Sequence, residues 1–287
     1  MFNKLIELYT KGDLAQLSSS ILHSTAWQQH DFTAYGNMQI ENLWLKSLEQ
    51  FGFLPLAEQQ TVQGDGFSAL YFELSVENQQ YSLAVSFFFE HNEQHIKRLR
   101  CIVDTLALAK LQQNEGKQIQ ELLPTPDPLL LSQFDHQLHP QSYHATPKDV
   151  CDLPKDIDNI MSQWWNIWQE KQLASFASLY NDDSQIKLAG SATSCGFHQL
   201  RSFHLKLHNR LNRSYCQLEN ICYDSEQNTL AILWHIDGDY LDVGATKRVR
   251  IPMMSFLTIE DNKIVKEQLQ VDWLSFTKRF QLHTAII

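Results

Sequence analysis

Near the end of the chain, one acidic residue, Asp272, is placed where its carboxylate could move a proton. Strand-forming residues over 263–274 predict a strand, and alternation along it puts Gln268, Gln270 and Asp272 on one face. A carboxylate enclosed by aromatic side chains has a raised pKa, by up to roughly 3–5 units when fully buried, which suits proton abstraction beside a carbonyl. Alternatively, Asp272 only accepts hydrogen bonds, as a repeated Asp104 in an earlier segment suggests. Both roles stay open.

His235 and Asp237 are a second candidate pair for acid–base chemistry. They share the strand face opposite Trp234, beside a predicted hairpin turn, and such a pair could exchange a proton with Asp272. The competing interpretation is an ordinary histidine at a sheet edge. The earlier segment has Phe-Glu-Leu at 72–74 instead, without histidine, so this chemistry would belong to the later half of the chain.

Three histidines on one predicted helix, His198, His204 and His208, raise the question of a metal. His204 and His208 have the i, i+4 spacing of two ligands on a helix face. No glutamate lies between them and no acidic third ligand is near in the sequence, so a helix face without metal is favoured. The five cysteines are odd in number and lack CxxC spacing, which indicates reduced, mostly buried thiols. We expect no cofactor and no metal.

These residues lie in a chain that repeats itself. Residues 264–274 align with 96–106, 168 positions upstream, and share Ile, Val-Asp and Leu, while 196–206 align with 36–46 at an offset of 160. The offsets differ by 8 because the second copy is longer around Gly238–Arg250. A duplication of this size predicts two similar domains.

The proline distribution separates the two copies. Six of the eight prolines fall between Pro124 and Pro154, which predicts an extended, fairly stiff linker over 112–154. The domains are then 1–111, which is divergent, and 155–287. Apolar residues in the linker, Leu129–Leu131 or Phe134, are expected to pack onto a domain.

Each copy shows three helical segments followed by four strand-like segments. In the first copy the expected helices are 2–9, 14–22 and 37–51, and the strands are 56–63, 67–76, 80–90 and 95–105. In the second the helices are 158–168, 173–180 and 198–211, and the strands are 215–223, 229–236, 248–259 and 263–274, with turns at 224–228, 237–239 and 260–262. The fold class is α+β, with three helices packed on a curved antiparallel sheet in each domain.

This layout resembles the SnoaL-like branch of the nuclear transport factor two-like superfamily. The similarity rests on the aromatic first helix, on Gly196 before the third helix, and on the segments Ala231–Asp239, Phe256–Ile264 and Val271–Asp272. It covers about 157–277 well and 1–110 more weakly. The resemblance implies two cone-shaped domains, but a poorly defined function, since such cones serve as isomerases, cyclases, dehydratases, epoxide hydrolases, carriers and assembly modules.

The resemblance also implies where a site would lie. In such cones the aspartate of the last strand faces the interior, which makes Asp272 a general acid or base with His235 beside it. The first helix roofs the pocket, so Trp168 and Tyr180 would cover it. Tyr240 and Gln270 would line it.

The first domain is expected to have a smaller or degenerate pocket. Arg100 and Ile102 replace the pocket-facing glutamines there, and Phe87–Phe89 offer bulk to fill the space. The two domains are expected to pair as an intramolecular pseudo-dimer about an approximate two-fold axis, and a homodimer of the chain is compatible with this.

Composition excludes some partners. The net charge is −10 and no basic run exceeds Lys97-Arg98, which argues against nucleic acid and anionic membranes. No stretch approaches the roughly 20 apolar residues of a membrane helix and the start lacks a signal-peptide block, so a cytoplasmic protein is expected. Three functions remain open: binding of a small, largely apolar ligand in the second domain, cofactor-independent isomerase, cyclase or dehydratase chemistry with Asp272, and a structural pseudo-dimer with filled pockets.

Overall fold

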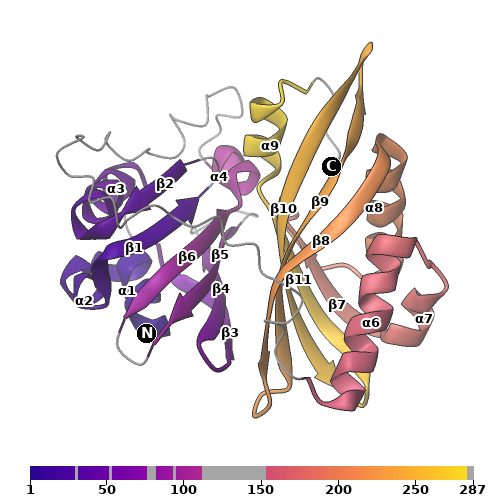
Figure 1. Cartoon of the computed structure of the whole chain (residues 1–287), viewed down its shortest axis with the longest axis horizontal. Helices are drawn as coiled ribbons and strands as arrows, with labels where there is room; N and C mark the ends of the chain where they lie inside the picture. The colour runs from indigo at the N-terminus through magenta and orange to yellow at the C-terminus, as the bar shows by residue number, and fades with distance from the viewer. Residues whose placement is uncertain (30–31, 52–53, 76–81, 93–94, 112–152, 283–287) are drawn as a thin grey trace. The chain divides into compact units, whose positions relative to one another are not determined.

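The computed structural model describes residues 1–29, 32–51, 54–75, 82–92, 95–111 and 153–282. The chain divides into two compact units, Met1–His144 and Ala145–Ile287, each of which combines helices with a single sheet (Figure 1). Nearly all of the predicted linker, including Leu129–Leu131 and Phe134, lies outside the described residues.

The first unit begins with two helices and builds a mixed sheet. Its elements are α1 (Phe2–Lys11), α2 (Leu14–Ser18), β1 (Ile21–Gln29), β2 (Phe32–Tyr35), α3 (Gly36–Phe51), β3 (Leu56–Gln63), β4 (Phe67–Ser75), β5 (Ser82–His91), β6 (Ile96–Val103) and α4 (Thr105–Leu111). The strand order in the sheet is β2-β1-β6-β5-β4-β3. The aromatic side chains of α1, α3 and the sheet meet on one face, where Tyr9 contacts Trp44, Phe72 and Phe87.

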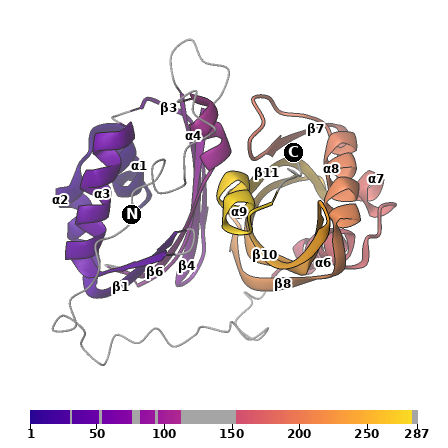
Figure 2. The ribbon, with the colours of Figure 1, turned by 90° about the horizontal axis from the view of Figure 1, so that it is seen from above.

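The second unit follows the same element order without a counterpart of β2. Its elements are α6 (Lys155–Glu170), α7 (Ser175–Leu179), β7 (Tyr180–Leu188), α8 (Phe197–Arg210), β8 (Leu211–Asp224), β9 (Thr229–Asp242), β10 (Ala245–Glu260), β11 (Lys263–Val271) and α9 (Trp273–Arg279). The strand order is β7-β11-β10-β9-β8, and the sheet bends strongly around its own axis (Figure 2).

Helix α6 shows why this sequence packs against a sheet. Its buried side chains recur every three or four residues, which puts them on a single stripe of the helix: Ile157, Ile160, Met161, Trp164, Ile167 and Trp168. Lys171 ends the helix in the left-handed conformation, where its amide bonds the Asn166 carbonyl. The apolar stripe therefore faces the sheet and brings two tryptophans into its curve.

Both sheets were predicted to be antiparallel, but each of them contains a parallel pair of strands. β1 lies parallel to β6, and β7 lies parallel to β11. In each unit a side-chain hydroxyl secures the irregular start of this pairing. Thr25 Oγ1 accepts from the Leu22 amide and donates to the Ile96 carbonyl. Ser184 Oγ accepts from the Asn181 amide at 2.8 Å and donates to the Ile264 carbonyl at 2.7 Å.

Several predicted boundaries were wrong. The helix predicted at 14–22 ends at Ser18, and β1 begins at Ile21. The strands predicted at 95–105 and 263–274 end earlier, because an aspartate after each strand begins a helix. The turn predicted at 237–239 is absent, since β9 continues to Asp242.

Across the described ranges, no helix is long and apolar enough to cross a membrane. The same part of the chain holds no group of three or more His, Cys, Asp or Glu side chains arranged to hold a metal ion.

Candidate functional site

Three tryptophans form the centre of the second unit. Trp164 and Trp168 come from α6 and Trp234 comes from β9, and their ring centroids lie 4.9–6.0 Å apart. Each side chain is at most 1% exposed. Because Trp234 faces α6, strand alternation assigns the helix-facing side of the whole sheet. We call these three residues the tryptophan cluster.

Glu267 of β11 is the one carboxyl group that the described residues place against this cluster. Trp164 Nε1 donates to Glu267 Oε1 at 3.3 Å, and the Tyr180 hydroxyl donates to Oε2 at 2.5 Å. The Glu267 side chain is fully buried. Tyr180 begins β7, the strand parallel to β11, so the parallel pairing and α6 together supply both donors.

Burial raises the pKa of Glu267 to about 7, because a charged carboxylate loses its hydration there. The two donors from Tyr180 and Trp164 favour the charged form and limit the rise. The pKa of Tyr180 is itself raised well above its ordinary value, first by burial and then by the Glu267 charge, so its hydroxyl keeps its proton. Glu267 therefore exchanges a proton near neutral pH, which is the condition for one group to serve as both acid and base.

A pair of buried histidines lies beside Trp168 of the tryptophan cluster. The His204 ring is 5.0 Å from Trp168 and 4.2 Å from the His208 ring. His204 Nε2 lies 2.8 Å from the Ile167 carbonyl, which can only accept, so Nε2 carries the proton. Burial lowers the pKa of His204 to about 4 and that of His208 to about 3. Both rings are neutral at physiological pH and contribute packing rather than charge.

The predicted face of the last strand was wrong. Glu267 faces α6, so alternation turns Gln268 and Gln270 to the opposite side of the sheet. The strand register agrees: Trp234 pairs with Met253 and Met253 with Val271, and Glu267 shares the parity of Val271 whereas Gln268 does not. A signal was present in the sequence: Leu269 and Val271 share the face of Glu267, and helices pack on the apolar face of a sheet, although Gln268 and Gln270 are buried as well.

Asp272 is the N-cap of α9, outside the strand. Its Oδ1 accepts a hydrogen bond from the Ser275 amide at 3.1 Å. Asp104 does the same before α4, where its Oδ1 accepts from the Ala107 amide at 2.9 Å. The repeated Val-Asp of the sequence thus marks two helix starts.

His235 lies on the face opposite the tryptophan cluster. Its Nδ1 is 2.8 Å from Glu219 Oε1 and its Nε2 is 2.7 Å from Gln217 Oε1. Asp237 is 3.2 Å from His235 Nε2 and is held by two hydrogen bonds from Arg250. These polar groups form a network of their own, apart from Glu267.

The remaining predicted site residues, Trp168, Tyr180 and Tyr240, lie in two different parts of the interior. Trp168 and Tyr180 are buried in the interior, and the Tyr180 hydroxyl donates a hydrogen bond to Glu267. Tyr240 is fully buried near the far end of β9, where its ring contacts Phe276 of α9. Of the predicted site residues, the structure therefore brings Tyr180 against Glu267, which was not predicted, while Trp168 lies in the tryptophan cluster, and within the described residues neither makes a hydrogen bond or ring contact with His235 or Gln270.

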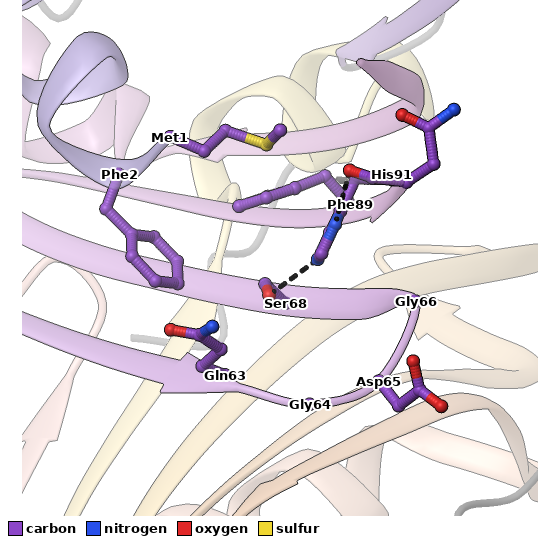
Figure 3. A pocket seen from close by; sticks show the side chains of 10 residues that line it. Met1, Phe2, Gln63, Gly64, Asp65, Gly66, Ser68, Phe89 and His91 are labelled. Carbon is purple, nitrogen blue, oxygen red and sulfur yellow. Dashed lines mark hydrogen bonds between the residues drawn. The ribbon is translucent and has the colours of Figure 1, made fainter. Parts of the chain in front are cut away.

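The first unit has no carboxyl group at the position of Glu267. Leu99 of β6 lies between Trp27 of β1 and Phe89 of β5, as Glu267 lies between the corresponding strands. Of the three phenylalanines predicted to fill this space, Phe87 and Phe89 lie in the helix-facing layer, whereas strand alternation turns Phe88 to the other face. Nevertheless a cavity of about 680 Å³ opens at the end of this layer, so the expected filling is incomplete (Figure 3).

The geometry defines the second unit as an α+β domain with a curved mixed sheet whose helix-facing side carries an enclosed carboxyl group. Residues 161–267 match the SnoaL-like domain family, a span that starts in α6 and ends on Glu267.

Solved structures of similar shape include a putative polyketide cyclase from Bacillus cereus ATCC 10987, at 12% identity and a TM-score of 0.41, covering 50% of this chain and 97% of that one. Another is IdmH from Streptomyces antibioticus, a putative polyketide cyclase, at 11% identity and a TM-score of 0.40, covering 45% and 100%. A putative SnoaL-like polyketide cyclase from Jannaschia sp. CCS1 gives 12% identity and a TM-score of 0.39, covering 45% and 96%. Comparison with curated proteins gives no match.

Proposed function

We propose that the second unit binds a small, largely apolar carbonyl compound and moves a proton on it without a cofactor, using Glu267 as acid and base. The observation that carries this proposal is the enclosed carboxyl group, whose pKa burial raises to about 7. The match of residues 161–267 to the SnoaL-like domain family supports it, because the matched span contains both Trp164 and Glu267.

The chemistry requires only one proton carrier. Ionised Glu267 takes a proton from the carbon next to the carbonyl group, and the electron pair moves onto the carbonyl oxygen as an enolate. The protonated carboxyl group then returns the proton to another carbon, which gives an isomer. In the cyclase variant the enolate carbon attacks a second carbonyl of the same molecule, and Glu267 protonates the new alkoxide.

Trp164 and Tyr180 have a positioning role in this scheme. Their two hydrogen bonds fix the carboxyl plane and keep the pKa from rising further. Because Glu267 is fully buried and Trp164 of the cluster contacts it, a ligand bound at Glu267 would lie against the cluster. Ligand binding is therefore expected to change tryptophan fluorescence.

The test is deuterium exchange on 2-tetralone, an apolar ketone with acidic protons beside the carbonyl. The full chain in D₂O should accelerate exchange at that carbon, as followed by proton NMR. Glu267→Gln should lower the rate to background while tryptophan quenching by 2-tetralone persists. Glu219→Gln is the matched control, since Glu219 lies by His235 on the other face of the sheet. Retained exchange in a folded Glu267→Gln variant would contradict the proposal.

The same experiment tests whether Asp272 has a catalytic role. As a helix cap it should affect stability but not exchange, so Asp272→Asn should keep the rate per folded molecule. If Asp272→Asn abolishes exchange in folded protein while Glu267→Gln does not, the acid–base role belongs to Asp272.

A second candidate is a non-catalytic unit whose interior is filled by side chains. The tight packing of the tryptophan cluster favours it, since its ring centroids lie within 6.0 Å of one another. This candidate predicts neither exchange nor quenching with 2-tetralone, so the two readouts together separate the candidates.

A further inference from the structure

The cavity of the first unit contains a polar pair with the geometry of an activated nucleophile. Ser68 of β4 and His91 at the end of β5 both line it, and Ser68 Oγ lies 2.8 Å from His91 Nε2 (Figure 3). Ser68 has 2% of its own surface exposed to solvent. A Ser–His pair at this separation is within the range for proton transfer from the hydroxyl to the imidazole.

A third group orients the imidazole. His91 Nδ1 lies 3.1 Å from the Asn92 backbone carbonyl, which can only accept a hydrogen bond. Nδ1 therefore carries the proton, and Nε2 presents a lone pair to the Ser68 hydroxyl. This is the order of nucleophile, base and orienting acceptor found in serine-dependent acyl transfer, with a backbone carbonyl in place of a carboxylate.

The rest of the lining combines polar groups with apolar surface for the apolar part of a substrate. Met1, Phe2 and Phe89 supply apolar surface, and the volume of about 680 Å³ is in the range of small-molecule sites. The turn between β3 and β4 lines the same cavity. This turn contributes Gly64, Asp65 and Gly66 to the lining, beside the strand that carries Ser68.

We propose that this cavity is an acyl-transfer site for a small carboxylic ester, with Ser68 as the nucleophile and His91 as its general base. Nε2 of His91 takes the hydroxyl proton as Ser68 Oγ bonds to the ester carbonyl carbon, and the π electrons move to oxygen. When the carbonyl re-forms, the bond to the alcohol breaks, and the alcohol leaves with the proton from Nε2. Water, deprotonated by the same nitrogen, then releases the carboxylic acid and restores the Ser68 hydroxyl.

This site is independent of the function proposed for the second unit. Its residues come from the first unit alone, and neither Glu267 nor the tryptophan cluster takes part. Loss of one activity by substitution should therefore leave the other intact.

Covalent labelling of the unaltered full chain is the direct test. A fluorophosphonate probe should form an adduct that peptide mass spectrometry locates on Ser68. A second Ser–His pair in the chain serves as an internal control, since Ser214 Oγ lies 3.3 Å from His208 Nδ1 in the second unit. The pKa of His208 is lowered to about 3, which makes it a poor base, so Ser214 should stay unlabelled. An absent adduct on Ser68 overturns the proposal, whatever happens to the variants.

Hydrolysis of p-nitrophenyl butyrate gives the kinetic test. Ser68→Ala and His91→Gln should each lower kcat/KM by roughly 100-fold or more, the usual loss for removal of a nucleophile or its base. Ser214→Ala should leave the rate unchanged. Circular dichroism and the thermal unfolding transition show whether each variant is folded. An unchanged rate in folded Ser68→Ala protein also overturns the proposal.

Discussion

Replacing Glu267 with glutamine should remove a pH dependence of stability that the wild-type protein has. Burial raises the pKa of Glu267 from 4.5 to about 7 in the folded chain. A raised pKa means that the folded state holds the proton more tightly than the unfolded state. The resulting stabilisation is fully present below about pH 4.5 and is lost as the pH rises through about 7.

The magnitude follows from the two pKa values. Between pH 5.5 and pH 8.5 the contribution of Glu267 to the free energy of unfolding falls by about 2 kcal/mol. For a unit of this size that loss corresponds to roughly 6 °C in Tm. Glutamine carries no charge at either pH and keeps an amide oxygen as acceptor for Tyr180 or Trp164. The Tm of the variant relative to wild type should therefore rise by about that amount between the two pH values.

Thermal unfolding followed by tryptophan fluorescence measures this difference, because five of the seven tryptophans lie in the second unit. Glu219→Gln is the control, since it alters a carboxyl group on the opposite face of the same sheet. Tyr180→Phe provides an independent check. It removes a donor to the charged form, so it should destabilise more at pH 8.5 than at pH 5.5. A constant Tm difference between wild type and Glu267→Gln across this range would refute the argument.

Three further outcomes are expected. Asp272→Ala and Asp104→Ala should each lower the free energy of unfolding by about 1 kcal/mol through loss of a helix cap, as measured by urea denaturation, and Asp→Asn at either site should cost less. Nitrogen-15 NMR should show His204 neutral and protonated on Nε2 at pH 5.5, where an exposed histidine is mostly charged; a charged His204 would contradict the burial argument. Burial raises the pKa of the Cys216 thiol to about 12, so Cys216 should not react with a disulfide reagent at pH 8 until the protein is unfolded.

Much of the fold could be predicted from periodicity, because it is a local property. Strand β3 was predicted with its observed bounds, and helix α3 to within one residue. The polar segment Tyr180–Leu188 gave no comparable signal. Its pairing is with a strand some 80 residues later, and a short polar edge strand carries no alternation that reveals its partner.

The position of the inward-facing carboxyl group was mispredicted for a different reason. The resemblance assigned an inward carboxylate to Asp272, but a Val-Asp after a strand is also the start signal of a helix. The observed N-cap bond to Ser275 shows that the second meaning holds here. Glu267 was overlooked because a glutamate in a strand usually marks the solvent face. Only the three-dimensional approach of Trp164 and Tyr180 shows how its burial is tolerated.

The parallel pairing of β7 with β11 also determines when the second unit can be completed. β7 is the first strand of the unit to be synthesised, and its neighbour in the sheet, β11, is the last. The β8–β9 and β9–β10 hairpins can form early during synthesis, because their strands are near neighbours in sequence. The edge strand β7 cannot pair, and its Ser184 hydroxyl cannot bond the Ile264 carbonyl, until β11 has been synthesised. Closure of this long loop is entropically costly and comes late. Glu267 acquires its hydrogen bond from Tyr180 only at that moment, so the enclosed carboxyl group is among the last features of the unit to be completed.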